Sequence, residues 1–223
     1  MSHPPVRAVL FDLDGTLADT ALDLAAAVNV ILKEQGRAVL PFAALRPLVS
    51  KGGRALLARA FPDLDVGERE VLLPKFLFAY AQALVVETVA FEGIEAMLAE
   101  LETRGVLWGI VTNKPEDLAR GVVDGLGWQH RSGALVGGDT LPVRKPAPEP
   151  LWLAAAQLGV TPAACLYVGD DARDIEAGNA AGMRSVAALW GYRDDGERPE
   201  SWLAEAHCAT PSDFHRWLLK VLP

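Results

Sequence analysis

Two carboxylates stand two residues apart at the end of an apolar run near the amino terminus. The run ends in Asp12, and Asp14 follows directly before Gly15. Asp and Gly are ordinary turn residues, so a solvated turn is the simplest interpretation. The pair also suits catalysis, because one acid can act as nucleophile and metal ligand while the other transfers a proton. We favour catalysis, since adjacent carboxylates repel each other and a cation beside them relieves that repulsion.

A second group of acids follows another apolar run, in the segment Gly-Asp170-Asp171-Ala-Arg-Asp174. Asp170 occupies the end of the expected strand. Mg²⁺ prefers oxygen ligands and usually keeps several waters, so Asp12 and Asp170 at neighbouring strand ends would suffice to hold it. For Asp171 a helix N-cap is the preferred interpretation, and Asp174 can be a charge in the first helical turn.

Two further segments offer groups that could bind an anion. Thr112 and Asn113 lie between an apolar run and Pro115, where side chains and the first helical amides can donate hydrogen bonds. A plain helix cap with proline in the first turn explains them equally well. Lys145 stands before Pro146, between another expected strand and helix. Taken alone, it would be read as a lysine on a surface loop.

The elements that must position these residues alternate along the chain. Helical patterns separate short runs that are rich in branched residues and followed by turn residues. Most of these runs are continuously apolar, as expected when both faces of a sheet are covered. The order predicts an α/β fold, a Rossmann-like parallel sheet core that binds ligands at the carboxyl ends of its strands. The expected strands are 6–12, 107–112, 134–138, 165–169, 185–190 and, more weakly, 207–210, and the expected helices are 93–104, 115–125, 148–158 and 172–181.

The stretch after the first expected strand is different, because it shows helical patterns only. Thr20 can cap a first helix that ends near Gly36. An all-helical insert at this point predicts a cap domain over the carboxyl ends of the strands. We therefore expect a core domain of residues 1–18 and 89–223 and an inserted all-helical cap domain of residues 19–88, with further helices at 42–49, 53–61 and 68–86.

Composition restricts the class of protein. A chain of 223 residues can bury a sizeable core, and its net charge of −8 without a basic stripe argues against binding nucleic acid or an anionic membrane. The two cysteines, Cys165 and Cys208, are expected to be buried and reduced. Neither a signal-peptide pattern nor a membrane-spanning stretch is present in the sequence, so we expect a cytoplasmic protein. No sequence feature indicates an oligomeric state.

Taken in chain order, the segments DLDGT, TN, KP and GDDARD resemble the four motifs of the haloacid dehalogenase superfamily. The resemblance covers essentially the whole chain, and the insert resembles that superfamily's first type of cap. It implies a Mg²⁺-dependent phosphatase acting on a small-molecule phosphate ester. Asp12 would attack phosphorus, and Asp14 would protonate the leaving oxygen and then activate water.

The resemblance also implies supporting roles for the other motif residues. Mg²⁺ would be held by Asp12, the backbone carbonyl of Asp14 and Asp170. Asp174 would orient Lys145 or a metal-bound water. The groups that bind the transferring phosphoryl would be Thr112 and Lys145, with help from Asn113. Such a site agrees with the chemistry, since phosphoryl transfer needs positioning and charge neutralisation above all.

Two features narrow the reaction. Relatives that cleave carbon–halogen bonds lack an acid at the position of Asp14, because a halide needs no proton, so a dehalogenase is not expected. A phosphomutase stays open, since the same carboxylates can return phosphate to a second hydroxyl. In the turn Ser-Lys51-Gly-Gly-Arg54 we prefer a contact of Lys51 or Arg54 with a substrate carboxylate or hydroxyl. The alternatives are a solvated loop and a Schiff base on Lys51, as in related phosphonate-cleaving hydrolases.

Within the phosphatases, the pattern resembles the phosphoglycolate phosphatases. Three stretches, beginning at Ser50, Leu107 and Val168, look closer to bacterial phosphatases of N-acetylmuramic acid 6-phosphate. Both substrates carry a carboxylate, which would suit a basic turn in the cap. We expect N-acetylmuramic acid 6-phosphate as the substrate, with 2-phosphoglycolate as the alternative.

Overall fold

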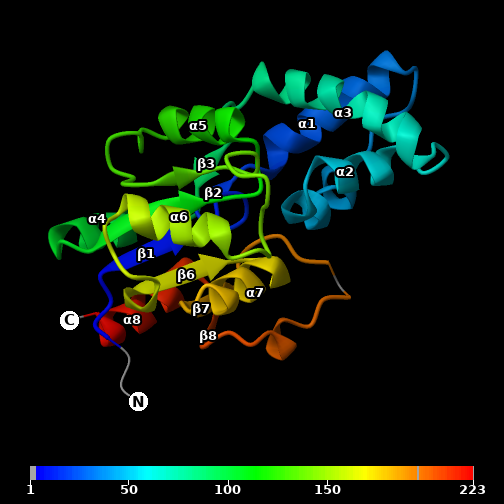
Figure 1. The fold of residues 1–223 in the computed structure, drawn as a ribbon. Helices are drawn as coiled ribbons and strands as arrows, with labels where there is room; N and C mark the ends of the chain where they lie inside the picture. The colour runs from blue at the N-terminus through cyan, green and yellow to red at the C-terminus, as the bar shows by residue number, and fades with distance from the viewer. Residues whose placement is uncertain (1–3, 195, 223) are drawn as a thin grey trace.

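The computed structural model describes residues 4–194 and 196–222, which form a larger α/β part and a smaller helical part (Figure 1). Six parallel strands form the central sheet in the order β5-β4-β1-β6-β7-β8. The predicted α/β fold is therefore confirmed, and the weak sixth strand is β8. The strands are β1 Ala8–Phe11, β4 Leu107–Val111, β5 Leu135–Val136, β6 Cys165–Gly169, β7 Arg184–Ala188 and β8 Ala206–Cys208.

Helices cover both faces of this sheet because both faces of its strands are apolar. On β1, Val9 and Phe11 belong to one buried cluster with α4, α5 and α8, whereas Ala8 and Leu10 belong to another with α6 and α7. This two-sided burial explains why the strands are continuously apolar. The sequence patterns missed α8. The helices are α4 Ile94–Thr103, α5 Glu116–Gly125, α6 Glu149–Gln157, α7 Ala172–Ala180 and α8 Pro211–Val221.

The helical part between β1 and β4 has an apolar cluster of its own, in which Val28, Leu56 and Phe76 are buried. Residues 42–49, expected as one helix, form two short 3₁₀ helices, the second of which has proline in its first turn. Proline suits the first turn of a helix, because the N–H group that it lacks would have no intrahelical acceptor there. The elements are α1 Ala21–Glu34, η1 Phe42–Ala44, η2 Arg46–Lys51, α2 Gly53–Ala60 and α3 Val66–Ala81.

The chain enters and leaves the helical part through a two-stranded antiparallel ribbon that the sequence patterns missed. In this ribbon β2 (Ala18–Asp19) pairs with β3 (Val89–Ala90). Strands of two residues carry too little hydrophobic alternation to be recognised from sequence. The chain therefore enters the helical part soon after β1 and returns beside the point where it entered.

Asp23, in the first turn of α1, fastens the returning crossing. Its buried carboxylate accepts hydrogen bonds from the backbone N–H groups of Val86, Glu87 and Thr88, at 3.1, 3.1 and 2.9 Å. The helix α3 ends at Ala81 and does not continue to residue 86 as expected. The amide of Val86, which the expected helix would have used, donates to Asp23 instead.

Both cysteines are buried and unpaired, as expected, with Cys165 in β6 and Cys208 in β8. Burial raises the pKa of each thiol to about 11, so both stay protonated near neutral pH and are poor nucleophiles. Among the described residues, none of the helices is both long enough and apolar enough to cross a bilayer.

Replacing Asp23 should destabilise the fold through the returning crossing. Asp23→Ala leaves three backbone amides without their acceptor, so we expect the free energy of unfolding to fall by roughly 2–4 kcal/mol. Asp23→Asn keeps one acceptor oxygen and should lose less. Urea unfolding followed by circular dichroism measures both. The exposed Glu34→Ala, on the same helix, should change the free energy by less than about 0.5 kcal/mol; equal effects of the Asp23 and Glu34 variants would contradict this account.

Candidate active site

Three polar residues of the predicted site follow directly on three adjacent strands. Asp12 follows β1 in the middle of the group, Thr112 follows β4 on one side and Asp170 follows β6 on the other. The backbone N–H of Asp12 donates to the carbonyl of Val168 at 2.9 Å, so the parallel pairing continues to the site itself. Residues more than 150 positions apart in the sequence are in this way brought to one edge.

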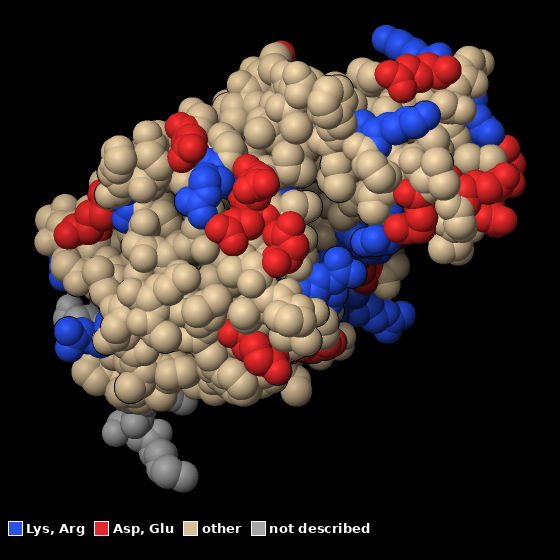
Figure 2. All heavy atoms as spheres, turned by 45° about the horizontal axis from the view of Figure 1, so that its top comes forward, with Lys and Arg blue, Asp and Glu red and all other residues tan. Residues whose placement is uncertain are grey.

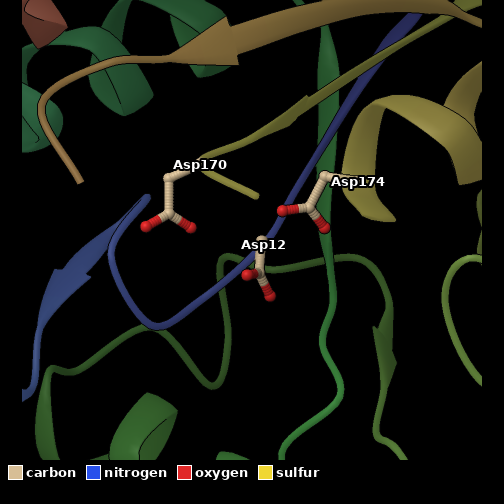
Figure 3. A group of neighbouring side chains, drawn as sticks. All are labelled: Asp12, Asp170 and Asp174. Atoms are coloured by element: carbon tan, nitrogen blue, oxygen red, sulfur yellow. The ribbon is translucent and has the colours of Figure 1, made fainter. Parts of the chain in front are cut away.

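Three carboxylates gather at this edge (Figure 3). Asp12, Asp170 and Asp174 each place an oxygen within 4.8 Å of the others, and all three are buried. Burial, together with Asp174, raises the pKa of Asp12 to about 6 in spite of Lys145 nearby. Burial, reinforced by Asp12 and Asp174, raises the pKa of Asp170 well above its usual range. The cluster is thus a place where negative charge is costly without a cation.

The donor set of this cluster fits a divalent metal ion. Carboxylate oxygens are the ligands that hard cations such as Mg²⁺ take. Oδ1 of Asp12 is buried and, apart from its ion pair with Lys145, has no hydrogen-bond partner among the described residues. Asp170 uses Oδ2 to accept from Ser50 Oγ at 2.6 Å and from the Tyr192 amide at 2.8 Å, which leaves Oδ1 more free to bind. The side chain of Asp14 lies outside this cluster.

Lys145 is buried beside the carboxylates, so the interpretation as a surface lysine is wrong. Its Nζ lies 2.9 Å from Asp12 Oδ1 and 2.7 Å from Asp174 Oδ1, and it also donates to the carbonyl of Val111 at 2.9 Å. Burial alone would lower its pKa, but Asp12 and Asp174 raise it above the usual value. Lys145 therefore supplies a fixed positive charge to the cluster.

Asp14 lies beside this cluster but has different partners. Its Oδ1 accepts from Thr20 Oγ1 at 2.6 Å, and both of its oxygens accept from Lys114 Nζ, at 2.8 and 3.1 Å. Thr20 does precede α1 as expected, but its hydroxyl holds Asp14 and does not cap the helix. The sequence reasoning missed Lys114. Its position one residue after Asn113, at the edge that also carries Asp14, is the signal that could have revealed it.

Thr112 and Asn113 are built into the walls of the site. Thr112 is buried, and its Oγ1 accepts from the backbone N–H of Lys114 at 3.2 Å. The side-chain amide of Asn113 donates to the backbone carbonyl of Lys145 at 3.0 Å, and its buried oxygen has no partner among the described residues. Both residues line the cavity. Asn113 thus connects the loop after β4 to the loop that carries Lys145.

The start of α7 holds the remaining predicted acids. Asp171 is the N-cap of α7, as expected, and it forms a capping box with Asp174. Arg173 binds Asp171 through Nε at 2.8 Å and donates from Nη2 to the backbone carbonyl of Ser50 at 2.7 Å. Ser50, which also bonds Asp170, therefore seats the helical part on the strand ends. Neither Ser50 nor Arg173 was assigned a role from the sequence.

A cavity of about 190 Å³ lies between the helical part and the sheet edge. Lys51 and Arg54 line it, but each is paired with acids. Lys51 Nζ lies 3.3 Å from Asp194 and 3.2 Å from Glu197. Arg54 donates to both carboxylate oxygens of Glu70, at 2.6 and 3.0 Å. Arg144 also lines the cavity and has no ion pair within residues 4–194 and 196–222. Figure 2 shows basic side chains gathered where the two parts of the molecule meet. The polar residues from the strand ends and the following loops that also line it are Asp12, Asp14, Thr112, Asn113 and Lys114.

Comparison with known proteins agrees with this geometry. A family model described as haloacid dehalogenase-like hydrolase matches residues 9–188. A phosphoglycolate phosphatase of Xanthomonas campestris is 55% identical over 92% of this chain and 93% of its own length. An N-acetylmuramic acid 6-phosphate phosphatase of Pseudomonas aeruginosa is 41% identical over 96% of this chain and 95% of its own.

Solved structures show the same fold. A predicted phosphoglycolate phosphatase from Haemophilus somnus superposes with a TM-score of 0.84 at 26% identity, covering 96% of this chain and 98% of the other. The family model matches well over half of the chain, and the Xanthomonas relative shares 55% of its residues with this chain over nearly its whole length. The chain belongs to the haloacid dehalogenase-like hydrolases and is a phosphoric monoester hydrolase of that family.

Proposed function

We propose that the protein hydrolyses a small carboxylated phosphate ester, 2-phosphoglycolate, through an aspartyl-phosphate on Asp12. The observation that carries the reaction is the placement of Asp12, buried at the central strand end with Lys145 at 2.9 Å and with Asp14 in the same cavity. A buried carboxylate beside fixed positive charge can accept an incoming phosphoryl group, whose negative charge would otherwise be repelled.

In this proposal each residue has a defined task. Asp12 attacks phosphorus while the bond to the ester oxygen breaks, and Asp14 gives that oxygen its proton. Asp14 then takes a proton from the water that attacks the aspartyl-phosphate, so the enzyme returns to its starting state. Lys145 and Thr112 hold the phosphoryl oxygens, and Asp174 keeps Lys145 in place through their 2.7 Å ion pair. Asn113 holds the loop that carries Lys145.

The phosphatases of this family use a divalent metal, and we propose Mg²⁺ for this chain. Asp12 and Asp170 would hold it, together with the backbone carbonyl of Asp14, and Asp174 lies close enough to bind one of its waters. The ion would neutralise charge on the phosphoryl oxygens. The net charge of −8 makes such local positive charge necessary for binding an anionic substrate.

We also propose that residues 19–88 act as a cap domain over a core of residues 1–18 and 89–223. The apolar cluster of the helical part and the ribbon at its two crossings support this division. The hydrogen bond from Ser50 of the helical part to Asp170 supports a closed arrangement of this cap. Closure of such a cap excludes water from the reaction.

Two observations favour 2-phosphoglycolate over N-acetylmuramic acid 6-phosphate, the substrate preferred from the sequence. The 55% identity to the Xanthomonas phosphoglycolate phosphatase exceeds the 41% identity to the Pseudomonas aeruginosa enzyme. The cavity of about 190 Å³ is also small, below the roughly 300–1,000 Å³ of most ligand pockets. A two-carbon acid suits that volume better than an amino sugar with acetyl and lactyl groups.

For the substrate carboxylate, Arg144 is better placed than the residues expected from the sequence. Lys51 and Arg54 are already paired with Asp194, Glu197 and Glu70, whereas Arg144 lines the cavity without an acidic partner in the described part of the chain. The acids around Lys51 outweigh its partial burial and raise its pKa. A Schiff base needs a neutral amine, so the phosphonate-cleaving alternative is less suited to this site.

Removing the nucleophile should abolish turnover. Asp12→Asn keeps the shape of the side chain but cannot form the acyl phosphate, so we expect kcat to fall by at least about 10⁴-fold. Phosphate release measures turnover, and circular dichroism checks that the fold is kept. The exposed Asp124→Asn removes the same charge from α5 and should leave kcat unchanged. Substantial turnover by Asp12→Asn would exclude Asp12 as the nucleophile.

Metal binding should depend on Asp170 and be visible without substrate. At a Mg²⁺ concentration about 100 times the Kd, the folded protein gains about 2.7 kcal/mol, which raises the melting temperature. Asp170→Asn should lose this shift, and Glu176→Gln on the exposed face of α7 should keep it. EDTA should silence the enzyme and Mg²⁺ should restore it. Full activity in EDTA would reject a metal-dependent mechanism.

The substrate is tested by measuring kcat/KM for both esters under one set of conditions. We expect 2-phosphoglycolate to be favoured by at least about tenfold, which corresponds to ~1.4 kcal/mol of differential transition-state binding. Arg144→Met should raise the KM for 2-phosphoglycolate about tenfold, through loss of a charged hydrogen bond, and leave that for 4-nitrophenyl phosphate unchanged. Comparable poor rates on both esters would reject both substrates. Dependence on a bisphosphate activator would instead indicate a phosphomutase.

A further inference from the structure

Lys114 is a buried cation to which the mechanism above gives no task. Its side chain is only 5% exposed, and its Nζ donates to three acceptors. Two are the carboxylate oxygens of Asp14, at 2.8 and 3.1 Å, and the third is the hydroxyl of Tyr80, at 2.9 Å. Nζ also lies 4.4 Å from the centre of the Tyr80 ring. An ammonium group is buried at such depth only when its partners are as well placed as these.

These three residues come from three separate segments of the chain. Asp14 follows β1, Lys114 lies in the loop between β4 and α5, and Tyr80 is the next-to-last residue of α3 in the helical part. Thr20, where the chain enters the helical part, adds a 2.6 Å hydrogen bond to Asp14 Oδ1. The position of the Asp14 carboxylate is therefore set jointly by the sheet edge and by the helical part seated upon it.

We propose that Lys114 is the positioning residue that fixes the Asp14 carboxylate for proton transfer, and that Tyr80 makes this positioning depend on closure of the helical part. The inference rests on the role proposed for Asp14 above. A carboxylate held at both oxygens by one ammonium cannot rotate freely, so its orientation toward the cavity is fixed before the substrate reacts.

The geometry also distinguishes the two oxygens of Asp14. Oδ1 accepts two short hydrogen bonds, from Thr20 and Lys114, whereas Oδ2 accepts only the 3.1 Å bond among the described residues. Oδ2 is thus the oxygen that carries the proton. It passes the proton to the ester oxygen as the P–O bond breaks, and later takes one from the attacking water. Lys114 keeps its own protons throughout, so the charges balance over the cycle.

Tyr80 links this arrangement to the state of the cavity. It belongs to the helical part, so its hydroxyl leaves Lys114 when that part lifts from the strand ends. The ammonium then loses one of its three acceptors and the ring that covers it. Asp14 is in this way held most firmly while the cavity is closed and water is excluded.

The test compares two esters that differ in their need for a proton. An alkyl ester such as 2-phosphoglycolate releases an alkoxide that must be protonated, whereas 2,4-dinitrophenyl phosphate releases a stable phenolate. Rapid-quench single-turnover experiments give the rate of leaving-group release. Lys114→Met should slow this step about 10²-fold or more with the alkyl ester, the lower range of general acid catalysis, and by far less with the aryl ester. Lys75→Met, exposed on α3, should slow neither.

Two further variants separate positioning from a merely structural role. Asp14→Asn and Asp14→Asn/Lys114→Met should release the alkyl leaving group at the same rate, because Lys114 acts through Asp14. Tyr80→Phe keeps the Lys114–Asp14 pair, so it should fold even if Lys114→Met does not. It should show a smaller loss, about threefold to tenfold, again with the alkyl ester alone.

Each outcome has a distinct meaning. Equal slowing of both esters by Lys114→Met, or an added loss in the double variant, overturns the positioning role. Tyr80→Phe with wild-type rates on both esters overturns the link to closure. A wild-type enzyme that hydrolyses neither ester rejects the proposed function itself. Should it act on N-acetylmuramic acid 6-phosphate and not on 2-phosphoglycolate, that sugar ester serves as the alkyl substrate and the comparison decides as before.

Discussion

The repulsion among three buried carboxylates is the constraint on which the rest of the structure depends. Asp12, Asp170 and Asp174 place oxygens within 4.8 Å of one another, and none of the three residues is more than 8% exposed. Like charges in a buried site destabilise a fold unless positive charge or hydrogen-bond donors offset them. Lys145 and the Ser50 hydroxyl supply part of that offset. The charge that remains is what a divalent cation would neutralise, so the cost of the cluster and its capacity to bind a metal have the same origin.

The parallel sheet makes this concentration of charge possible. With β4, β1 and β6 adjacent and parallel, the residues that follow them fall on one edge, although they are far apart in the sequence. Backbone pairing continues to Asp12 and Thr112, whose N–H groups bond the carbonyls of Val168 and Val136. The acids are therefore held by the buried strands of the sheet. Two apolar clusters, one on each face, stabilise the sheet and so offset the electrostatic repulsion at its edge.

The strands and their terminal acids could be predicted because each is a local pattern: an apolar run followed by Asp or Thr. A contact of Asp174 with Lys145 was expected from the family resemblance. The other partners of those acids could not be predicted, since they depend on which segments meet in space. The contact of Lys114 with Asp14 depends on β4 lying beside β1, and the contact of Tyr80 with Lys114 depends on α3 packing at the sheet edge. Neither contact can be inferred from the order of residues in the chain. The ribbon of β2 and β3 was missed because strands of two residues carry no periodicity. The expected helix over α3 ran too far, to residue 86, whose amide is bonded by Asp23, 63 residues earlier in the chain.

Contacts between the helical part and the sheet edge differ in strength, which bears on the proposal that the helical part moves as a cap. At the crossings, the buried carboxylate of Asp23 holds several backbone amides, and such bonds are costly to break. At the rim of the cavity, Lys51 meets Asp194 and Glu197 as partly exposed ion pairs, which contribute about 0–1 kcal/mol each. The rim ion pairs therefore add little to the cost of opening, whereas breaking the crossings would cost much more. The cap proposed above would pivot at the ribbon, and its opening would break the contacts of Ser50 with Asp170 and of Tyr80 with Lys114.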